Sequence, residues 1–439
     1  MAARGLRREL GLASATAMVA GECIAVGIFL TPAGMAKALG SPLWLLIVWL
    51  AVGAMTLSGA LCYGELASRF PRTGGTYVYL KESFGPASAF LYGWMCLLVL
   101  DPGLTASLAT GAAGYAAYMF HWPGAVIKIA AIATIWIFCG LNMLSVGLSA
   151  GLLRWVTYLK LAVLGLLVVW ALGLHLGSWS NFVPFVAQRP GSLPLGPALA
   201  VGMVGAFYAF GGWWEVSRIA GEVRDPGPTL RRALILGVLV VTAVYVVVSA
   251  AFLYLVPLQN VISDDTFVAQ VGAVLFGPTG GVVFAAIVVL CVLGSLAAKL
   301  MSAPRVYFAM AEDGLFLKSV ALVHPRFGTP IAAILIVGAI SSLLVAEGSF
   351  QQIIAYFIFV AVVFLGLTVA GLFMVRNRQE DAGPAILTPG YPATPIAFLL
   401  LVLLLMALII GHSPREPLIG SCVVLAGLPA YAVFRRRTS

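Results

Sequence analysis

Charged side chains are scarce in this sequence. Only 9% of its 439 residues are Asp, Glu, Lys or Arg, whereas 62% are hydrophobic. Soluble domains carry about a quarter of their residues as charges and cannot bury so much apolar surface. The composition therefore excludes a soluble enzyme and predicts a protein that resides in a lipid bilayer.

Side chains that bind metals or nucleotides are also few. The four histidines do not cluster, and the six cysteines fall inside apolar runs without a CxxC pair. We therefore expect no metal site, and cysteines that are small buried side chains rather than disulfides. The sequence also lacks the G-x-x-x-x-G-K-S/T loop that binds ATP phosphates. No cofactor is expected, and ATP-driven transport has no support.

Long hydrophobic runs dominate the chain instead. A run of about 20 apolar residues matches the thickness of a bilayer. The connections between runs are short and leave no room for a soluble catalytic domain. We expect twelve spans, at residues 11–37, 42–67, 86–118, 124–147, 150–174, 194–221, 231–256, 279–303, 329–346, 350–375, 393–411 and 417–434.

Basic residues are distributed unequally between the two sets of connections. If the N-terminus is inside, the inner connections receive Arg7, Arg8, Arg231, Arg232 and many other basic residues. The positive-inside rule then predicts a protein of the cell membrane with both termini on the cytoplasmic side. Contact with anionic lipid explains the net charge of +9 without nucleic acid. The outer side receives only Lys37, Lys128, Arg189 and Arg415.

Two of the runs are interrupted near their middle. The sixth meets the adjacent glycines Gly211 and Gly212 before it resumes as a helix, and the first holds Glu22 between Gly21 and Gly27. Each glycine weakens a helix by about 1 kcal/mol relative to alanine and frees backbone groups that lipid cannot hydrate. In the first run, close helix packing at the small residues is the alternative.

The interruptions occupy corresponding positions in two five-span halves that cross the membrane in opposite directions. The halves cover residues 11–175 and 194–376, and residues 393–434 add two more spans. Paired broken helices of this kind indicate a secondary transporter with an inverted repeat and a binding site at the bilayer midplane. Free N–H groups at such breaks attract a carboxylate, and free carbonyls attract a cation.

The same stretches resemble motifs of the amino acid–polyamine–organocation (APC) superfamily. Gly21 to Pro32 is similar to the first-helix motif G-x-I-I-G-S-G-I-F-x-x-P. Within the superfamily the sequence looks closest to the L-type amino-acid transporter branch. Further matches follow in the family's order, at residues 69–79, 208–213, 221–226, 304–305 and 309–316.

The resemblance implies an all-α integral membrane protein of the leucine-transporter type. Such a fold has twelve transmembrane helices in a single membrane domain, here residues 1–439, with a 5+5 inverted repeat and broken helices 1 and 6. It also implies an amino-acid substrate. Backbone N–H groups of the first helix would hold the carboxylate, and carbonyls of the sixth would hold the amino group.

By the same resemblance, the carboxylate site is Ala25, Val26 and Gly27, flanked by Ile24 and Ile28. Ala25 stands where the family has a glycine, and Val26 stands where it has a serine. The backbone donors are kept but a hydroxyl is lost. The pocket is therefore expected to be more apolar and to prefer a different size of substrate side chain.

The sixth-helix part of the implied site is Tyr208, Ala209, Phe210, Gly211 and Trp213. Tyr208 matches the family's aromatic gate, and Phe210 lies two residues further on. Both immediately precede the break, which favours a role in closing over the substrate. The alternative is that these aromatics are core residues, as about half of such side chains are in a helix bundle.

Ionisable residues inside spans need a partner or a function, because each costs about 2.5–3.5 kcal/mol on insertion scales. Lys160 matches the fifth-helix lysine that, in sodium-independent members of the superfamily, is thought to place an ammonium where relatives bind sodium. It would hold first-helix carbonyls or release a proton. The alternative is a side chain that reaches the membrane interface near Arg154.

Glu22 and Asp101 are further candidates for ion coupling. Either could accept a coupling proton, contact a substrate amine or pair with a cation elsewhere in the bundle. Glu215 and Arg218, three residues apart, are expected to neutralise each other. Lys299 is expected to reach the inner interface.

The leading hypothesis is a sodium-independent secondary transporter of small neutral amino acids or related amines. It would work by alternating access, through exchange or proton symport. A membrane-embedded enzyme would need clustered His, Asp or Glu in facing spans, which the sequence does not indicate. A channel, the third class, would show flux that does not saturate.

Eukaryotic L-type members often join an ancillary glycoprotein through a cysteine in the loop after the third span. Residues 120–124, which form that loop here, contain no cysteine. We therefore expect a monomer that works without a disulfide-linked subunit, in contact with its substrate and with membrane lipid.

Overall fold

The computed structural model describes residues 10–24, 27–72, 74–144, 149–257, 267–316, 331–348, 350–378, 386–412 and 414–438. Within these residues the regular elements are all helices, and the only β pairing is an isolated bridge between Leu10 and Val223. The expected all-α class is therefore confirmed.

The helices account for the apolar runs seen in the sequence. Ten helical segments of the described chain are long and apolar enough to cross a membrane, and two shorter apolar helices cover Ile331–Glu347 and Pro417–Val433. Each of these segments falls on one of the twelve predicted runs. That all twelve cross the membrane stays a prediction.

In chain order the elements are α1 (Leu12–Cys23), α2 (Gly27–Leu30), α3 (Pro32–Leu39), α4 (Pro42–Arg69), α5 (Thr76–Phe84), α6 (Pro86–Met95), η1 (Cys96–Leu100), α7 (Asp101–Phe120), α8 (Gly124–Leu144), α9 (Ser149–Gly173), η2 (Trp179–Phe182), α10 (Leu195–Phe210), η3 (Trp213–Glu222), α11 (Pro226–Leu255), α12 (Phe267–Ser302), α13 (Pro304–Glu312), α15 (Ile331–Glu347), α16 (Phe350–Asn377), α17 (Ala393–His412), α18 (Arg415–Leu425) and α19 (Gly427–Thr438).

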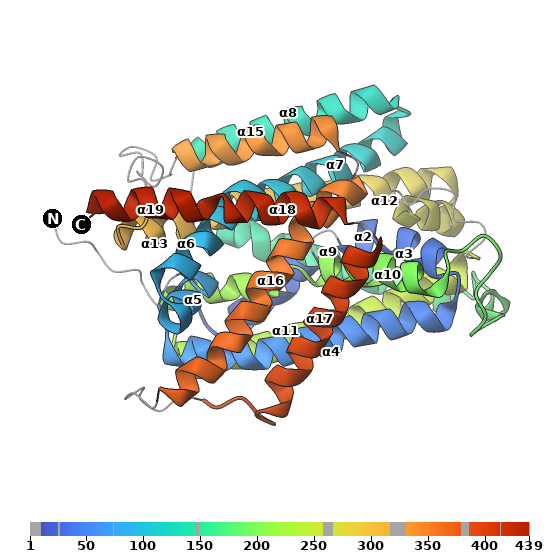
Figure 1. Cartoon of the computed structure of the whole chain (residues 1–439). Coiled ribbons are helices and arrows are strands. Elements are labelled where there is room, and N and C mark those ends of the chain that lie inside the picture. The colour runs from blue at the N-terminus through green and yellow to red at the C-terminus, as the bar shows by residue number, and fades with distance from the viewer. Residues whose placement is uncertain are drawn as a thin grey trace.

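Most of these helices lie side by side along a common direction, whereas α16 and α17 cross the bundle obliquely (Figure 1). α8 and α15 pack against each other along one edge, and α4 and α11 do so along the opposite edge. α7 and α12 pack together between these edges. The broken spans lie inside this arrangement, because α1 contacts α9, α11 and η3.

Small residues let α1 approach its neighbours closely. A Cβ added to Gly21 would lie 2.3 Å from Thr157 Oγ1 of α9. Close approach through small residues is the usual way in which transmembrane helices associate, since lipid gives no hydrophobic drive between them. For Gly21, the packing interpretation of the first-span glycines is therefore confirmed.

The sixth span breaks at the predicted glycines. α10 ends at Phe210, Gly211 is extended (φ −53°, ψ 142°), and Gly212 has φ +103°. Only glycine adopts that last conformation without strain. The chain resumes as a helix, as predicted, and this helix, η3, is of the 3₁₀ type and begins at Trp213.

The first span is also interrupted. α1 ends at Cys23, Ile24 caps it, and the short helix α2 begins at Gly27. Ala25 and Val26, which the resemblance assigns to the carboxylate site, lie outside the described residues. In the third span a π-helical segment, η1, ends immediately before Asp101, the residue at which α7 begins. Single π turns often occur near functional sites.

Candidate functional site

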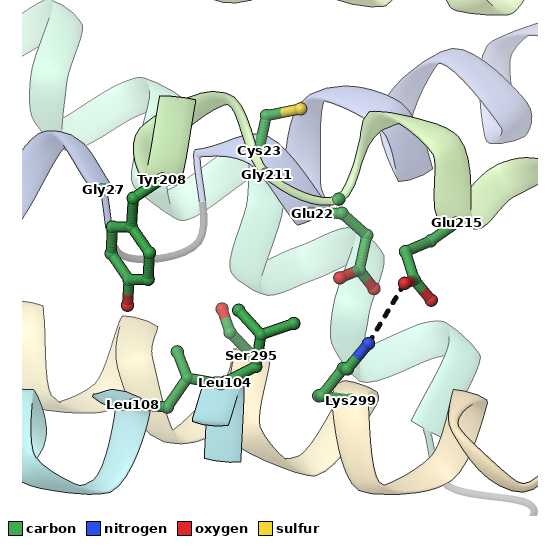
Figure 2. Close-up of a pocket in the computed structure, with 11 residues that line it drawn as sticks. Glu22, Cys23, Gly27, Leu104, Leu108, Tyr208, Gly211, Glu215, Ser295 and Lys299 are labelled. Atoms are coloured by element: carbon green, nitrogen blue, oxygen red, sulfur yellow. Dashed lines mark hydrogen bonds and ion pairs between the residues drawn. The ribbon is translucent and has the colours of Figure 1, made fainter. Parts of the chain in front are cut away.

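A cavity lies where the two broken spans meet α7 and α12. Figure 2 shows its walls, which include both breaks and three charged side chains. Its volume is about 40 Å³, which is room for a few water molecules. An amino-acid ligand would therefore require the walls to move apart. The lining residues are Glu22, Cys23 and Gly27 of the first span, Leu104 and Leu108 of α7, Tyr208, Gly211, Gly212 and Glu215 of the sixth span, and Ser295 and Lys299 of α12.

The two breaks touch each other directly beside this cavity. A Cβ added to Gly27 would lie 2.0 Å from Ala209 Cα, so the two backbones pack without an intervening side chain. Cys23 Sγ donates a hydrogen bond to the Phe210 carbonyl oxygen at 3.1 Å. A larger residue at Gly27 would force the spans apart.

Tyr245 of α11 binds a carbonyl group of each broken span. Its hydroxyl oxygen lies 2.7 Å from both the Cys23 and the Ala209 carbonyl oxygens, which share its single proton. Carbonyls at helix ends have no partner within their own helix and need one elsewhere. We did not identify Tyr245 from the sequence. The sequence signal that could have pointed to it is a tyrosine inside a run of Val, Thr and Ala. A hydroxyl buried in such a run requires a hydrogen-bond partner.

The predicted aromatic residues separate into two groups. Tyr208 lines the cavity, and its hydroxyl donates to Ser107 Oγ of α7 at 3.0 Å. Phe210 is not among the lining residues and packs on Trp49 and Tyr245, with ring centroids 6.2 and 5.1 Å away. Their arrangement agrees with a gate position for Tyr208 and with the core alternative for Phe210.

The remaining residues of the expected site lie around the cavity rather than in it. Trp213 is buried with its ring edge-on to Tyr63, at a centroid distance of 4.9 Å. Ile24 and Ile28 are fully buried in the hydrophobic core. Ala209 supports the break through its backbone, as described above.

Four charged side chains form a buried network at one end of the cavity. Lys299 Nζ lies 3.1 Å from Asp101 Oδ1 and 3.1 Å from Glu215 Oε1. Arg218 Nη1 lies 2.7 Å from Glu215 Oε2, which confirms the expected pair. Tyr307 donates its hydroxyl proton to the other oxygen of Asp101. This network therefore links η3 to α7, α12 and α13.

The network corrects the expectation for Lys299 and selects one of the alternatives left open for Asp101. Lys299 does not reach an interface: it is only 3% exposed, because the carboxylates of Asp101 and Glu215 compensate its buried charge. Asp101 adopts the alternative of pairing with a cation. That Glu22, Asp101 and Glu215 come close together was not predicted, because each is at least 79 positions from the next along the chain.

Lys160 is fully buried, so the interpretation as a lysine reaching the interface is wrong. Its ammonium donates to Ser295 Oγ at 2.7 Å, and Ser295 lines the cavity. Ser295 Oγ in turn donates to the Cys291 carbonyl oxygen at 3.1 Å. Lys160 therefore stands behind the cavity wall, in contact with it through one hydroxyl. Two of the first-helix carbonyls that Lys160 was expected to hold, those of residues 25 and 26, lie outside the described residues.

An apolar pocket adjoins the cavity. It shares Leu104, Tyr208 and Gly211 with the cavity and continues towards Trp214 of η3 and Phe357 of α16. Apolar pockets beside a few polar groups are typical of sites for small molecules. Within the described residues, His, Cys, Asp and Glu side chains do not group in threes as a metal site requires.

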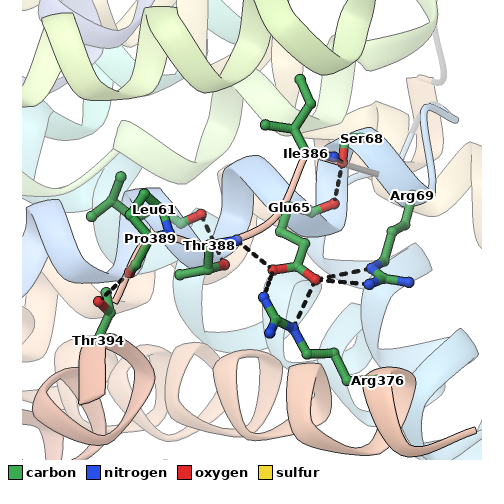
Figure 3. Close-up of polar contacts among 9 residues, drawn as sticks. All are labelled: Leu61, Glu65, Ser68, Arg69, Arg376, Ile386, Thr388, Pro389 and Thr394. Carbon is green, nitrogen blue, oxygen red and sulfur yellow. Dashed lines mark hydrogen bonds and ion pairs between the residues drawn. The ribbon is translucent and has the colours of Figure 1, made fainter. Parts of the chain in front are cut away.

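A second buried carboxylate lies away from the cavity, at the Arg69 end of α4. Glu65 accepts hydrogen bonds from Arg69 and Arg376, the closest at 2.9 and 2.5 Å, and from the Thr388 backbone N–H at 2.7 Å (Figure 3). Arg376 also stacks on the Tyr391 ring, 3.7 Å from its centroid. These residues, the Glu65 cluster, tie α4 to α16 and to the segment that follows it.

The cysteines are unpaired among the described residues, and five of the six are buried as expected. Cys422 is the exception, since it is exposed on α18. Its position in an apolar run did not reveal which side of the helix faces outwards.

Comparison with known proteins identifies the family. Residues 10–428 match the amino acid permease family. The chain is 27% identical over 436 residues to the serine/threonine exchanger SteT of Bacillus subtilis (strain 168), covering 99% of this chain and 98% of that protein. It is 28% identical over 434 residues to the human b(0,+)-type amino acid transporter 1, covering 98% and 88%.

A third relative is the human cystine/glutamate transporter, which is 27% identical over 435 residues, covering 98% of this chain and 85% of that protein. The relatives are amino-acid transporters of the L-type branch and a bacterial exchanger, and the matches extend over nearly the whole chain. The broken sixth span and the many apolar helices are consistent with these matches. The chain belongs to the amino acid permease family of the APC superfamily.

Proposed function

We propose that this protein is a sodium-independent secondary transporter of small neutral amino acids or related amines. The observation that carries the proposal is the cavity at which two broken spans meet, with Gly27 on one wall and Gly211 on the other. Broken helices at such a cavity offer peptide groups that bind both ends of a zwitterion without a side-chain ion.

The proposed fold is the leucine-transporter type. Its first repeat is residues 11–175, its second is residues 194–376, and residues 393–434 supply two added helices. Both termini would lie in the cytoplasm, because the positive-inside rule assigns the Arg-rich connections to that side. The basic cluster at Arg435 to Arg437 agrees with this orientation.

In the proposed binding mode the substrate carboxylate meets N–H groups at residues 25–28, and the amino group meets carbonyls at residues 209–211. Tyr208 closes over the substrate from α10. The adjoining apolar pocket towards Phe357 would receive an apolar substrate side chain. Because Ser107 already holds the Tyr208 hydroxyl, gate movement would be coupled to α7.

Lys160, Glu22 and Asp101 are the proposed ion-coupling residues, with different roles. Lys160 would take the place of sodium, since its buried ammonium supports the cavity wall through Ser295. Asp101 is neutralised by Lys299 and would act by holding α12 to α7. Glu22 faces the cavity itself. Exchange and proton symport both remain consistent with this arrangement.

The test is uptake by the purified chain in proteoliposomes. We expect uptake of radiolabelled L-serine, L-threonine or L-alanine to saturate, to increase when the vesicles contain unlabelled amino acid, and to persist when choline replaces sodium. Flux that rises linearly with concentration would indicate a channel instead. Absence of uptake and of trans-stimulation for all amino acids and amines tested would refute the proposal. A current on substrate addition would separate proton symport from neutral exchange.

A further inference from the structure

The connection between α9 and α10 carries an apolar surface without charge. No Asp, Glu, Lys or Arg occurs between Lys160 and Arg189, although α9 ends at Gly173 and the rest of that stretch is a loop with one short 3₁₀ helix, η2. In residues 174–187, which we call the apolar loop, the exposed large hydrophobic side chains are Leu174, Leu176, Trp179, Val183, Phe185 and Val186. Exposed apolar patches of this kind mark contact with a membrane or with another protein.

Several carbonyls of the apolar loop have hydrogen-bond partners within the protein. Arg189 Nη2 donates to the Asn181 carbonyl oxygen at 2.7 Å. The Phe185 carbonyl oxygen accepts from Ser41 Oγ at 2.9 Å and from the Leu43 backbone N–H at 3.1 Å. Irregular backbone is tolerated in contact with lipid only where the protein itself supplies such partners. The loop therefore meets a requirement that an aqueous loop does not have, since water would satisfy its carbonyls.

Further ties fix the loop to the end of α3. The Arg189 backbone N–H donates to the Gly40 carbonyl oxygen at 2.9 Å, and Gln188 Nε2 donates to the Leu39 carbonyl oxygen at 3.1 Å. Carbonyls at a helix end have no partner within their own helix, so these bonds serve both elements. Held in this way, the loop presents its apolar side chains outwards and does not turn them into the protein.

The position of the loop agrees with that of a bilayer surface. Figure 1 shows the loop, in green, extending from the end of the bundle at which α3 and α10 lie. Val169 and Leu172, exposed apolar residues near the end of the candidate span α9, lead directly into it. The Trp179 ring packs on Tyr254 at the end of α11, with centroids 4.9 Å apart. Tryptophan gathers at membrane–water interfaces, because its ring is apolar and its N–H group is polar.

We propose that the apolar loop is a membrane-anchoring surface whose partner is the phospholipid bilayer. Trp179 and Val183, which are 67% and 72% exposed, enter the interface of the outer leaflet in the orientation proposed above. The surface is separate from the cavity, and the proposal does not depend on the transport function. Because the loop has no Lys or Arg, we expect it to enter neutral phosphatidylcholine as readily as an anionic bilayer.

Fluorescence of Trp179 tests its depth. The full-length chain and Trp179→Phe are placed in nanodiscs of phosphatidylcholine that carries bromine either in the upper part of its acyl chain or near the methyl end. The difference in emission between the two proteins belongs to Trp179. We expect bromine in the upper part to quench this difference about twofold more strongly than bromine near the methyl end.

Trp136→Phe is the matched control. Trp136 is 41% exposed and lies near the middle of α8, a candidate span, so bromine near the methyl end should quench its emission more strongly. Equal and weak quenching of the Trp179 difference by both lipids would place the loop outside the bilayer and overturn the proposal. Stronger quenching from the methyl end would overturn the placement at the interface.

A spin label provides a second measurement if Trp179→Phe does not fold. The label is attached at Val183→Cys after Cys422→Ser has removed the exposed native cysteine, and Arg72→Cys, at an exposed arginine, is the aqueous reference. We expect the label at position 183 to be more accessible to oxygen than to a water-soluble nickel complex. High accessibility to nickel would place the loop in water. Low accessibility to both would indicate a second copy of the chain on the loop, and either result would overturn the proposal.

Discussion

The Glu65 cluster and the central cavity place two carboxylates of membrane spans in opposite situations. Glu65 has no exposed side-chain surface and accepts from two guanidinium groups and a backbone N–H. Glu22, in the cavity, has no partner among the described residues. A satisfied buried charge holds elements together, whereas an unsatisfied one indicates a ligand or a proton. The comparison separates charges that maintain the fold from those that serve the site.

The largest effect is expected from a substitution at the sixth-span break itself. Gly212→Ala introduces a side chain at φ +103° and 2.9 Å from Glu22 Cβ, so both the backbone and the packing resist it. We expect exchange to fall by a factor of about 100 or more. The control is Gly114→Ala in α7, where an added Cβ meets nothing within 4 Å. Equal exchange by the two variants would show that the break does not shape the site.

Lys160→Ala should come next. It removes the ammonium that binds Ser295 and leaves that part of the cavity wall unsupported. We expect uptake to be abolished while the protein stays folded, as judged by a monodisperse gel-filtration profile. Wild-type uptake in this variant would remove the argument that the lysine replaces sodium. Lys128→Ala, at an exposed lysine that donates to the Ala346 carbonyl, provides the control.

Glu65→Gln tests the other side of the comparison. Removing one partner of a buried ion pair leaves the other charge uncompensated, at a cost of about 3 kcal/mol of folding stability. We expect a lower midpoint of thermal unfolding but a KM within about threefold of wild type, since the cluster lies away from the cavity. A large change in KM with an unchanged midpoint would reverse the roles assigned to the two regions.

Tyr245→Phe should have a moderate effect on turnover. The ring packing is kept, but the Cys23 and Ala209 carbonyls lose their shared donor. An unsatisfied buried acceptor costs about 1–3 kcal/mol, so we expect the exchange rate to change by about tenfold. If only the melting temperature changed, Tyr245 would be a structural residue with no part in positioning the breaks.

The smallest effect is expected at a half-exposed ion pair between α5 and the end of α13. Lys81 Nζ lies 2.6 Å from Asp313 Oδ1, and both side chains are 32% exposed. Pairs of this kind contribute about 1 kcal/mol or less. Burial, together with the hydrogen bond from Tyr77 to Asp313, raises the pKa of Tyr77 above its usual range. Because the Lys81–Asp313 pair contributes so little, Lys81→Ala should leave exchange and thermal stability close to wild type. A large loss of either would contradict this ranking.

Much of the architecture could be predicted from the sequence because bilayer thickness and backbone hydrogen bonding allow few solutions. Apolar runs gave the helices, and Gly211-Gly212 gave the break, since lipid cannot hydrate the freed peptide groups. The i,i+3 pair of Glu215 and Arg218 is local and was equally predictable. Lys299 and Tyr245 were not, because their partners lie on other helices and depend on how those helices rotate.

The sequence by itself determined that this chain is a helical membrane protein with a glycine break in its sixth span, because composition and backbone chemistry act locally. Only the tertiary structure decided which charges are paired. It placed Lys299 between Asp101 and Glu215, Lys160 behind Ser295 and Glu22 against the cavity. The reason is that the cost of a buried charge depends on its neighbours across helices, and sequence distance does not reveal them.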